Sequence, residues 1–246
     1  LLWLPRPALL VLAIAVVAWH NLFDGLRVQG NGLLAVLWKV LHQRDWIEAG
    51  ALRLRTSYPL LPWIGVIALG YLMGPWFGRE RAPEQRQRWL LWAGIGALAL
   101  FALLRFANQY GDAPWQYQTT TLRTWLSILN ITKYPPSLQF LLLTLGVGLL
   151  LLRLYEWPPL ALALRPLADI GAAPMFFYLL HLYVLKGLYL AALAIWGPTH
   201  GDLYALDSVA GLVLVACALA VVLYPPTRAF ARFKARRRDL AWLRYL

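Results

Sequence analysis

The sequence predicts an all-α, polytopic helical membrane protein with about six transmembrane helices, which form part of a larger bundle. Two observations support this fold class. Hydrophobic residues make up 61% of the 246 positions, and they gather in runs long enough for a helix to cross a bilayer. No segment shows the alternation of apolar and polar residues that is typical of membrane β-barrel strands.

Six apolar runs are long enough to be spans. In chain order they cover residues 7–26, 59–77, 89–109, 137–154, 173–196 and 208–223. Because no Gly/Ser-rich linker or internal repeat interrupts them, we treat residues 1–246 as a single transmembrane helical domain. The sequence starts at Leu1 without an initiator methionine, and its first apolar run continues to span length, unlike a signal peptide. We therefore expect that N-terminal spans are missing from it.

The distribution of basic residues predicts how the spans are oriented. If Arg6 is cytoplasmic, the connections 79–88 and 153–165 and the tail lie on the same side, which then holds 14 of the 23 Lys and Arg residues. Both termini are therefore predicted to be cytoplasmic. Residues 225–246 form a basic cytoplasmic tail that lies on anionic lipid or, alternatively, binds an anionic nucleotide-like cosubstrate. The basic residues that set the orientation of the spans account for the net charge of +12. We therefore expect no nucleic acid as a partner.

Local signals assign the remaining elements. Residues 27–57 form an outer segment with a turn at 30–32 and an amphipathic helix around 33–41 that is too short to span. His42, beside this helix, is interpreted as an interface residue rather than a ligand. Pro59 opens the second span, where a missing N–H costs little. Glycines in the second and third spans permit close helix packing, namely Gly65, Gly70, Gly74, Gly94 and Gly96.

Polar residues near the outer ends of two spans are candidate functional residues, because ionisable groups in hydrocarbon are costly. The first span ends in His20, Asn21 and Asp24, and His20 and Asp24 share one helix face. They form either a polar site or an interfacial cap on the helix end. Arg105 and Asn108 share a face of the third span. Arg105 either snorkels to the outer surface or contacts an anion or substrate, and we expect both residues to converge with His20 and Asp24.

The fifth span carries Tyr178, His181 and Lys186. Lys186 lies about 20 Å into a span about 36 Å long, near the midplane, so it cannot easily snorkel. We predict that it faces the bundle interior near Tyr178 or Tyr189. Hydrogen bonding between helices explains each of these polar residues as well as a functional role does.

Motifs of soluble enzymes are not found. The sequence has no zinc spacing, P-loop, dinucleotide fingerprint or nucleophile–His–acid order. The single cysteine, Cys217, lies in an apolar span and excludes an internal disulfide and a cysteine-based metal site. No metal is expected.

Five strings, in this order, resemble one family. They are His-Asn-Leu-Phe-Asp-Gly at 20–25, Tyr-Pro-Leu-Leu-Pro-Trp-Ile-Gly at 58–65, Thr-Lys-Tyr-Pro-Pro-Ser-Leu at 132–138, Phe-Phe-Tyr-Leu-Leu-His-Leu at 176–182 and Phe-Ala-Arg-Phe-Lys-Ala-Arg-Arg-Arg-Asp at 230–239. Together they resemble bacterial relatives of heparan-alpha-glucosaminide N-acetyltransferase over nearly the whole chain, as the C-terminal portion of that fold. Lys186 stands where relatives often have a second histidine.

The resemblance implies a membrane-embedded acyltransferase of the bacterial cytoplasmic (inner) membrane. Such an enzyme takes acetyl from acetyl-CoA, its cosubstrate, and delivers it to an amino sugar or similar glycan acceptor across or at the membrane. The expected partners are membrane lipids and this acceptor, with a homodimer possible. The family's catalytic histidine lies in an early segment that has no match here, so the catalytic residue stays unknown, with His20 and His181 as candidates.

Acyl transfer to an amine needs a base, because only the neutral amine attacks the thioester. The reaction also needs hydrogen-bond donors that stabilise the developing oxyanion. His20 or His181 would supply the base. The candidate substrate-binding residues are Asn21, Asp24, Arg105, Asn108, Lys133, Tyr134, Tyr178 and Lys186. Two alternatives to an enzyme remain open: a transporter or flippase for an anionic or glycan-linked lipid, whose buried polar groups would form a path, and a non-catalytic membrane subunit.

Overall fold

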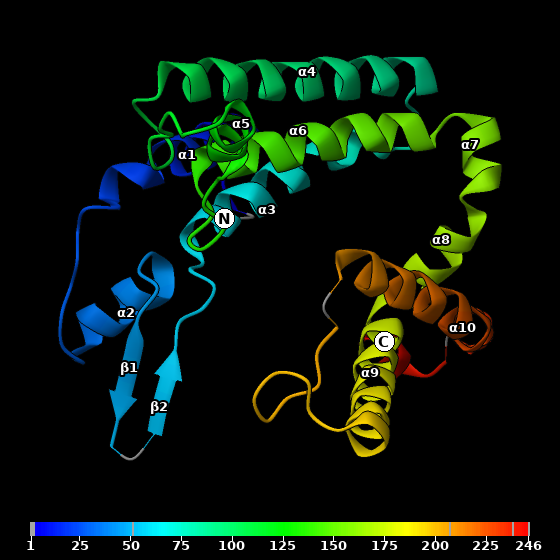
Figure 1. The fold of residues 1–246 in the computed structure, drawn as a ribbon. Helices are drawn as coiled ribbons and strands as arrows, with labels where there is room; N and C mark the ends of the chain where they lie inside the picture. Colours follow the sequence, from blue (N-terminus) through cyan, green and yellow to red (C-terminus); the bar gives the residue numbers. More distant parts are fainter. Residues whose placement is uncertain (1–2, 51, 207, 238, 246) are drawn as a thin grey trace. The chain divides into compact units, whose positions relative to one another are not determined.

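The computed structural model describes residues 3–50, 52–206, 208–237 and 239–245, and it divides at Tyr155 into two compact units (Figure 1). Within the described residues, five helices are long and apolar enough to cross a membrane, which confirms the predicted class of all-α polytopic membrane protein. They are α1 with η1 (Arg6–Trp19 and His20–Phe23), α4 (Pro83–Ala107), α6 (Leu138–Tyr155), α9 (Pro174–Trp196) and α10 (Val209–Arg236).

The remaining predicted span is shorter than the other five. It consists of α3 (Leu61–Met73), continued by the 3₁₀ helix η2 (Gly74–Phe77). Pro62 lies in the first turn of α3, as expected for a residue without an N–H group. The third span, in contrast, begins earlier than predicted, because polar residues from Pro83 onward continue α4 beyond its apolar part.

The first unit, up to Tyr155, contains two pairs of packed helices, α1 with α3 and α4 with α6 (Figure 1). Glycines make these contacts close. A Cβ atom on Gly65 would lie 2.8 Å from a methyl group of Val17, and a Cβ atom on Gly146 would lie 2.9 Å from Leu98. The predicted role of glycine in helix packing is therefore confirmed at Gly65, and also at Gly94, which faces Leu150.

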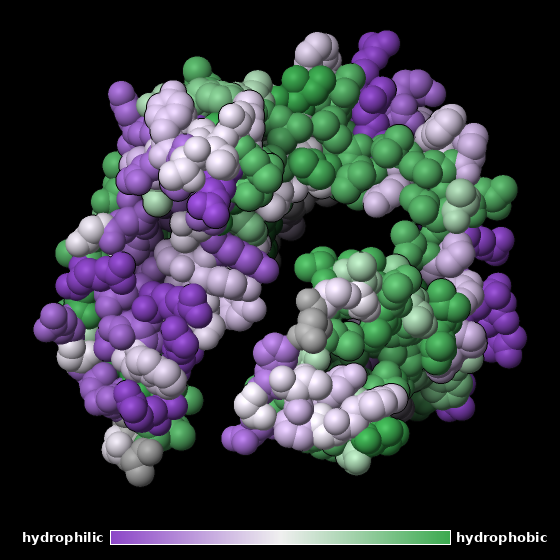
Figure 2. Space-filling model, viewed as in Figure 1, coloured by the Kyte–Doolittle hydropathy of each residue, from purple (hydrophilic) through white to green (hydrophobic). Residues whose placement is uncertain are grey.

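Only a small part of the apolar surface in this unit is buried. The core consists of two clusters, one around Leu9 and Ala13 of α1 and one around Leu138 and Leu141 of α6. Large apolar side chains cover the outside of the helices, and Figure 2 shows this hydrophobic band over α4 and α6. An exposed surface of this kind is what a bilayer would cover.

A polar segment connects the first two spans, and in Figure 2 it appears as a hydrophilic region. It holds the predicted helix as α2 (Leu33–Leu41) and an antiparallel pair of strands, β1 (Trp46–Ala49) and β2 (Leu52–Arg55), which the sequence analysis did not predict. Lys39 of α2 is buried and donates from Nζ to the carbonyl oxygen of Trp46 at 2.8 Å. This contact ties α2 to the strands.

The first unit also contains α5 (Thr121–Leu129), which precedes α6. The hydroxyl of Thr120 accepts a hydrogen bond from the Arg123 N–H at 3.3 Å and so caps its N-terminus.

The second unit, from Glu156, contains the short helices α7 (Pro158–Ala163) and α8 (Arg165–Gly171), followed by α9, α10 and η3 (Ala241–Tyr245). Phe176 of α9 stacks on Phe230 of α10, with ring centres 4.1 Å apart. The predicted basic tail begins inside α10, which continues through Pro225 and Pro226 to Arg236.

Candidate functional site

The predicted site residues fall into two groups. Those of the first unit gather where α1, α4 and α6 meet the segments around α5. Tyr178, His181 and Lys186 lie on α9 in the second unit.

A polar cavity of about 540 Å³ opens beside the end of η1 in the first unit. Four stretches line it: the residues after η1, the residues after α2, the start of the loop after α4, and the segment that enters α6. Its lining residues are Asn21, Asp24, Leu26, Arg27, His42, Gln43, Arg44, Asp112, Ala113, Thr132, Tyr134, Pro135 and Ser137. Of the predicted candidates, this set contains Asn21, Asp24 and Tyr134.

The centre of this cavity is an Asp–His pair. His42 is 3% exposed, and its Nε2 lies 3.1 Å from Oδ1 of Asp24. Asn21 donates from Nδ2 to the other carboxylate oxygen at 2.7 Å, and its own Oδ1 accepts from the Leu138 N–H at 2.8 Å. Burial alone would raise the pKa of Asp24, but the hydrogen bonds from His42 and Asn21 outweigh it and lower that pKa.

The second ring nitrogen of His42 is the unusual atom of the cavity. Nδ1 is buried and has no hydrogen-bond partner in the described part of the chain. Because the ionised Asp24 can only accept, Nε2 carries a proton, and in the neutral imidazole Nδ1 is the atom that holds the lone pair. Trp38 and Phe23 pack around the ring, with centres 5.2 and 6.2 Å away, and hold its orientation. A buried acceptor without a partner calls for an explanation, and because His42 lines the cavity, a proton donor bound there would supply one.

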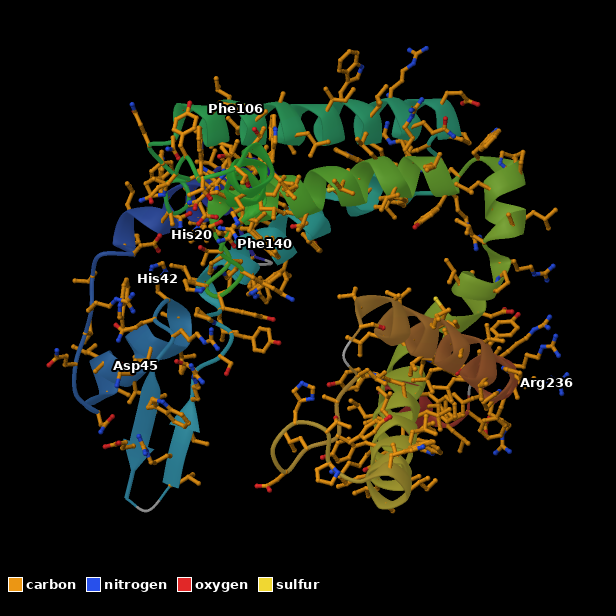
Figure 3. All side chains as sticks on the ribbon, in the orientation of Figure 1. His20, His42, Asp45, Phe106, Phe140 and Arg236 are labelled. Atoms are coloured by element: carbon orange, nitrogen blue, oxygen red, sulfur yellow. The ribbon has the colours of Figure 1, made fainter. Side chains whose placement is uncertain are left out.

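His20 lies beside this pair and is 1% exposed, yet it does not line the cavity. Figure 3 labels both histidines, whose ring centres lie 6.2 Å apart. Nδ1 of His20 faces the carbonyl oxygen of Val17 at 3.0 Å, and Nε2 faces that of Pro136 at 2.9 Å. Because the ring is buried and a backbone carbonyl group lies against each nitrogen, neither nitrogen is accessible to a substrate. The geometry gives His20 the role of joining the end of α1 to the entry of α6.

Arg105 is buried rather than snorkelling, at 1% exposure. Its guanidinium donates five hydrogen bonds, which is the full number that the group carries. The acceptors are oxygen atoms of Ile128, Ala113, Gln139, Ser127 and Asn130, at 2.6 to 3.2 Å. No donor is left for a substrate, so the geometry makes Arg105 the anchor of α5 and its flanking loops.

Asn108 is likewise engaged with the backbone. It ends α4 in the left-handed conformation, with φ of 56°, which Asn tolerates better than most residues. Its side chain accepts from the Trp115 N–H at 2.8 Å and donates to the Trp115 carbonyl at 3.0 Å. Arg105 and Asn108 therefore organise the loops and do not line the cavity beside Asp24.

The second carboxylate of the cavity, Asp112, is also fully engaged. It accepts hydrogen bonds from the backbone and hydroxyl of Thr132, at 2.8 and 2.7 Å, and from the hydroxyl of Ser137 at 2.7 Å. In contrast, Arg27 and Arg44 form no ion pair or hydrogen bond among the described residues, although Arg44 lies over the Tyr134 ring at 5.5 Å. The cavity therefore holds two carboxylates engaged by protein donors and two arginines without such partners among the described residues.

Tyr134 stands at the edge of the cavity within a small aromatic and basic cluster. Its hydroxyl lies 3.2 Å from that of Tyr58, and Lys133 lies 5.1 Å from its ring centre. The hydrogen bond with Tyr58 and then the amine of Lys133 lower the pKa of Tyr134. The structure thus places both Lys133 and Tyr134 near the cavity, where the resemblance implied a substrate contact.

In the second unit, His181 and Lys186 do not form a comparable site. Nδ1 of His181 faces the carbonyl oxygen of Phe177, one turn earlier, at 3.3 Å. The amine of Lys186 lies 4.9 Å from the ring centre of Tyr189, as predicted, but Lys186 is exposed on the surface of its unit. Tyr178 is 52% exposed and packs beside His181.

Sequence reasoning missed most residues of this cavity, among them His42, Arg27, Arg44 and Asp112. The signal that the sequence does contain is the position of His42, directly after the amphipathic helix Leu33–Leu41. Among the described residues, no group of three or more His, Cys, Asp and Glu side chains gathers as metal ligands.

Comparisons with protein-family models, with curated proteins and with solved structures found no match to this chain.

Proposed function

We propose that this protein is a membrane-embedded acyltransferase that moves an acetyl or similar acyl group from acyl-CoA to an amino sugar or related glycan acceptor. The observation that carries the proposal is the Asp24–His42 pair at the polar cavity, with the Nδ1 atom of His42 buried and unpartnered. A carboxylate that orients an imidazole whose other nitrogen holds a lone pair is the usual arrangement of a general base.

His42 would act on the acceptor amine. The neutral amine attacks the thioester carbonyl, its N–C bond forms, and Nδ1 of His42 takes the proton that the nitrogen loses. The C–S bond then breaks, and the proton passes from Nδ1 to the departing thiolate of CoA. Asp24 stabilises the imidazolium that forms between these two steps, because its carboxylate already contacts Nε2.

The size and chemistry of the cavity support a sugar-sized acceptor. Its volume of about 540 Å³ lies within the range of small-molecule sites, and both polar and apolar residues line it. Asn21 and the segment 132–137 hold the carboxylates in place, so the site would need little rearrangement on binding. In the orientation that the basic residues predict, this cavity lies on the outer side of a bacterial cytoplasmic membrane.

The test uses the full chain in detergent, with acetyl-CoA and glucosamine, and measures the release of the CoA thiol together with N-acetylated sugar. His42→Gln keeps a polar group beside Asp24 but cannot take a proton, so we expect a loss of about 100-fold or more in turnover. Asp24→Asn should lose less, because the base stays present but less well oriented. His200→Gln, on an exposed loop of the second unit, is the matched control and should keep wild-type turnover.

Two outcomes would contradict the proposal. Wild-type turnover in His42→Gln at equal folded protein would remove the base from the mechanism. Movement of a glycan-linked lipid across vesicles that contain the wild-type protein, without any loss of thioester, would favour the transporter instead.

A further inference from the structure

The short helix α5 of the first unit turns its apolar side away from the protein. Its large apolar side chains recur at the spacing i, i+3, i+4 and i+7, which places them on one helix face. They are 54 to 70% exposed and consist of Leu122, Trp125, Leu126 and Leu129. Apart from buried Ile128, the inner side is polar, and the hydroxyl groups of Thr124 and Ser127 accept from backbone N–H groups of the preceding loop, at 3.0 and 3.1 Å. This arrangement is the reverse of a helix that packs against a protein core.

The other short helix, α2, is inverted in the same way. Its buried side carries Ala35 and Lys39, followed by His42 directly after the helix. Its outer side is apolar and 48 to 81% exposed, with Leu33, Leu34 and Leu37. Two helices of one unit thus present leucine faces that the described residues leave uncovered.

Both helices are fixed at the ends of predicted spans. On α5, the carbonyl groups of Ser127 and Ile128 accept from the guanidinium of Arg105, in the last turn of α4, at 2.8 and 2.6 Å. At the end of α2, the carbonyl group of Val40 accepts from the N–H of Leu60, which directly precedes α3, at 3.0 Å. Since the ends of transmembrane helices mark the boundary between hydrocarbon and water, α2 and α5 lie at this boundary.

Lipid is the cover that this position favours. Each helix has nine residues and is about 14 Å long, too short to cross hydrocarbon about 30 Å thick. Exposed Phe23, at the end of η1, packs edge-on against Trp38 of α2, with ring centres 5.9 Å apart. Because η1 completes a span with an apolar surface, the medium that covers this span also reaches α2.

We propose that α2 and α5 are in-plane helices that insert their leucine faces into the membrane, in the leaflet where α1 and α4 end. Interfacial helices bury their apolar face about 5–10 Å into the boundary between headgroups and acyl chains. Lipid contact on one side of α2 then supports the contact of His42 with Asp24 on the other side. This docking surface is independent of the acyl-transfer chemistry and of the acceptor in the cavity.

Nitroxide labels on single cysteines test the surface in the full chain with Cys217→Ser, reconstituted into phosphatidylcholine vesicles. Molecular oxygen concentrates in hydrocarbon and a nickel chelate stays in water, so their relative effects on spin relaxation give the depth of the label. We expect labels at Leu34→Cys and Leu126→Cys to lie about 5–10 Å below the headgroups. Arg53→Cys on β2 and Arg123→Cys on α5 are matched controls at exposed polar positions, and the nickel chelate should reach both.

Either of two results would overturn the proposal. Nickel collisions at residues 34 and 126 as frequent as at the control positions would place both leucine faces in water. Labels that neither reagent reaches would mean that protein covers these faces, whether another part of the chain or a second copy. Should Leu34→Cys or Leu126→Cys fail to fold, Leu33→Cys and Leu122→Cys test the same faces, because both side chains are exposed there.

Discussion

Arg105 of α4 donates from Nη1 to Oε1 of Gln139 on α6 at 3.2 Å, and Gln139 donates in turn from Nε2 to the carbonyl oxygen of Tyr110 at 2.7 Å. Both side chains are 1% exposed. A buried charge is tolerated when hydrogen bonds surround it, and here neutral oxygen atoms take the place of a counter-ion. The pair therefore couples the two spans to the loop that carries Asp112, one wall of the cavity.

Replacement of Arg105 should reduce stability strongly. Arg105→Met leaves buried carbonyl groups of α5 without donors, at about 1–3 kcal/mol each, so we expect a total loss of at least about 3 kcal/mol. Arg105→Lys should recover only part of it, because three donors on a flexible chain cannot reproduce the planar fork. Thermal unfolding in detergent measures the loss, with exposed Arg123→Gln on α5 as the control. Stability within about 0.5 kcal/mol of wild type in Arg105→Met would contradict the anchoring role.

The Asp24–His42 contact predicts a dependence of stability on pH. Because the pKa of Asp24 is lowered in the folded state, its ionised form stabilises the fold above the unfolded value of about 3.9. This contribution is lost as the pH falls through the folded-state pKa, which lies lower. Asp24 is about half exposed, so we expect a contribution of only about 1 kcal/mol.

Comparison of the wild type with Asp24→Asn across pH tests this expectation. The difference in melting temperature should shrink below about pH 4, as Asp24 becomes protonated in the wild type. Asp202→Asn, on an exposed loop of the second unit, should show no such difference at any pH. A difference that grows as the pH falls would contradict the direction of the pKa shift.

Glycine substitutions distinguish the glycines at which two helices touch from those that face open space. Gly146→Ala would bring a Cβ atom to 2.9 Å from Cγ of Leu98, so we expect a loss of about 1–3 kcal/mol in stability. Gly96→Ala meets no atom within 4 Å and should be neutral or stabilising by up to about 1 kcal/mol, because alanine favours the helix. Equal melting temperatures of the two variants in detergent would show that α4 and α6 do not pack through Gly146.

The spans could be predicted from sequence because length and hydropathy are local properties. The bounds of α6 and α9 differ from the predicted ones by only a residue or two, whereas α10 continues past its apolar part into the basic residues. The strand pair of residues 46–55 was missed, although Leu52 and Leu54 alternate there with Arg53 and Arg55, the period of a strand.

The site was only partly predictable, because its contacts join distant residues. Depth in the membrane singled out His20 and Arg105, and both are indeed buried. Depth alone does not identify their partners, which are backbone oxygens and, for Arg105, also the side-chain oxygen of Gln139. His42 became a candidate only when the chain brought it back to Asp24, 18 residues earlier, a contact that no periodicity contains.

The orientation of the spans stays a prediction, and α4 offers the sharpest test. Gln85 lies in its first turn and exposed Gln118 lies in the loop beyond its other end, so the helix separates them by about 36 Å. In a Cys217→Ser background, a cysteine at Gln85 should react with an impermeant thiol reagent only after the membrane is opened. A cysteine at Gln118 should react in intact cells, since the basic residues place the 79–88 connection in the cytoplasm. The reverse pattern would put the Asp24–His42 cavity on the cytoplasmic side, and labelling of both cysteines from one face would mean that α4 does not span.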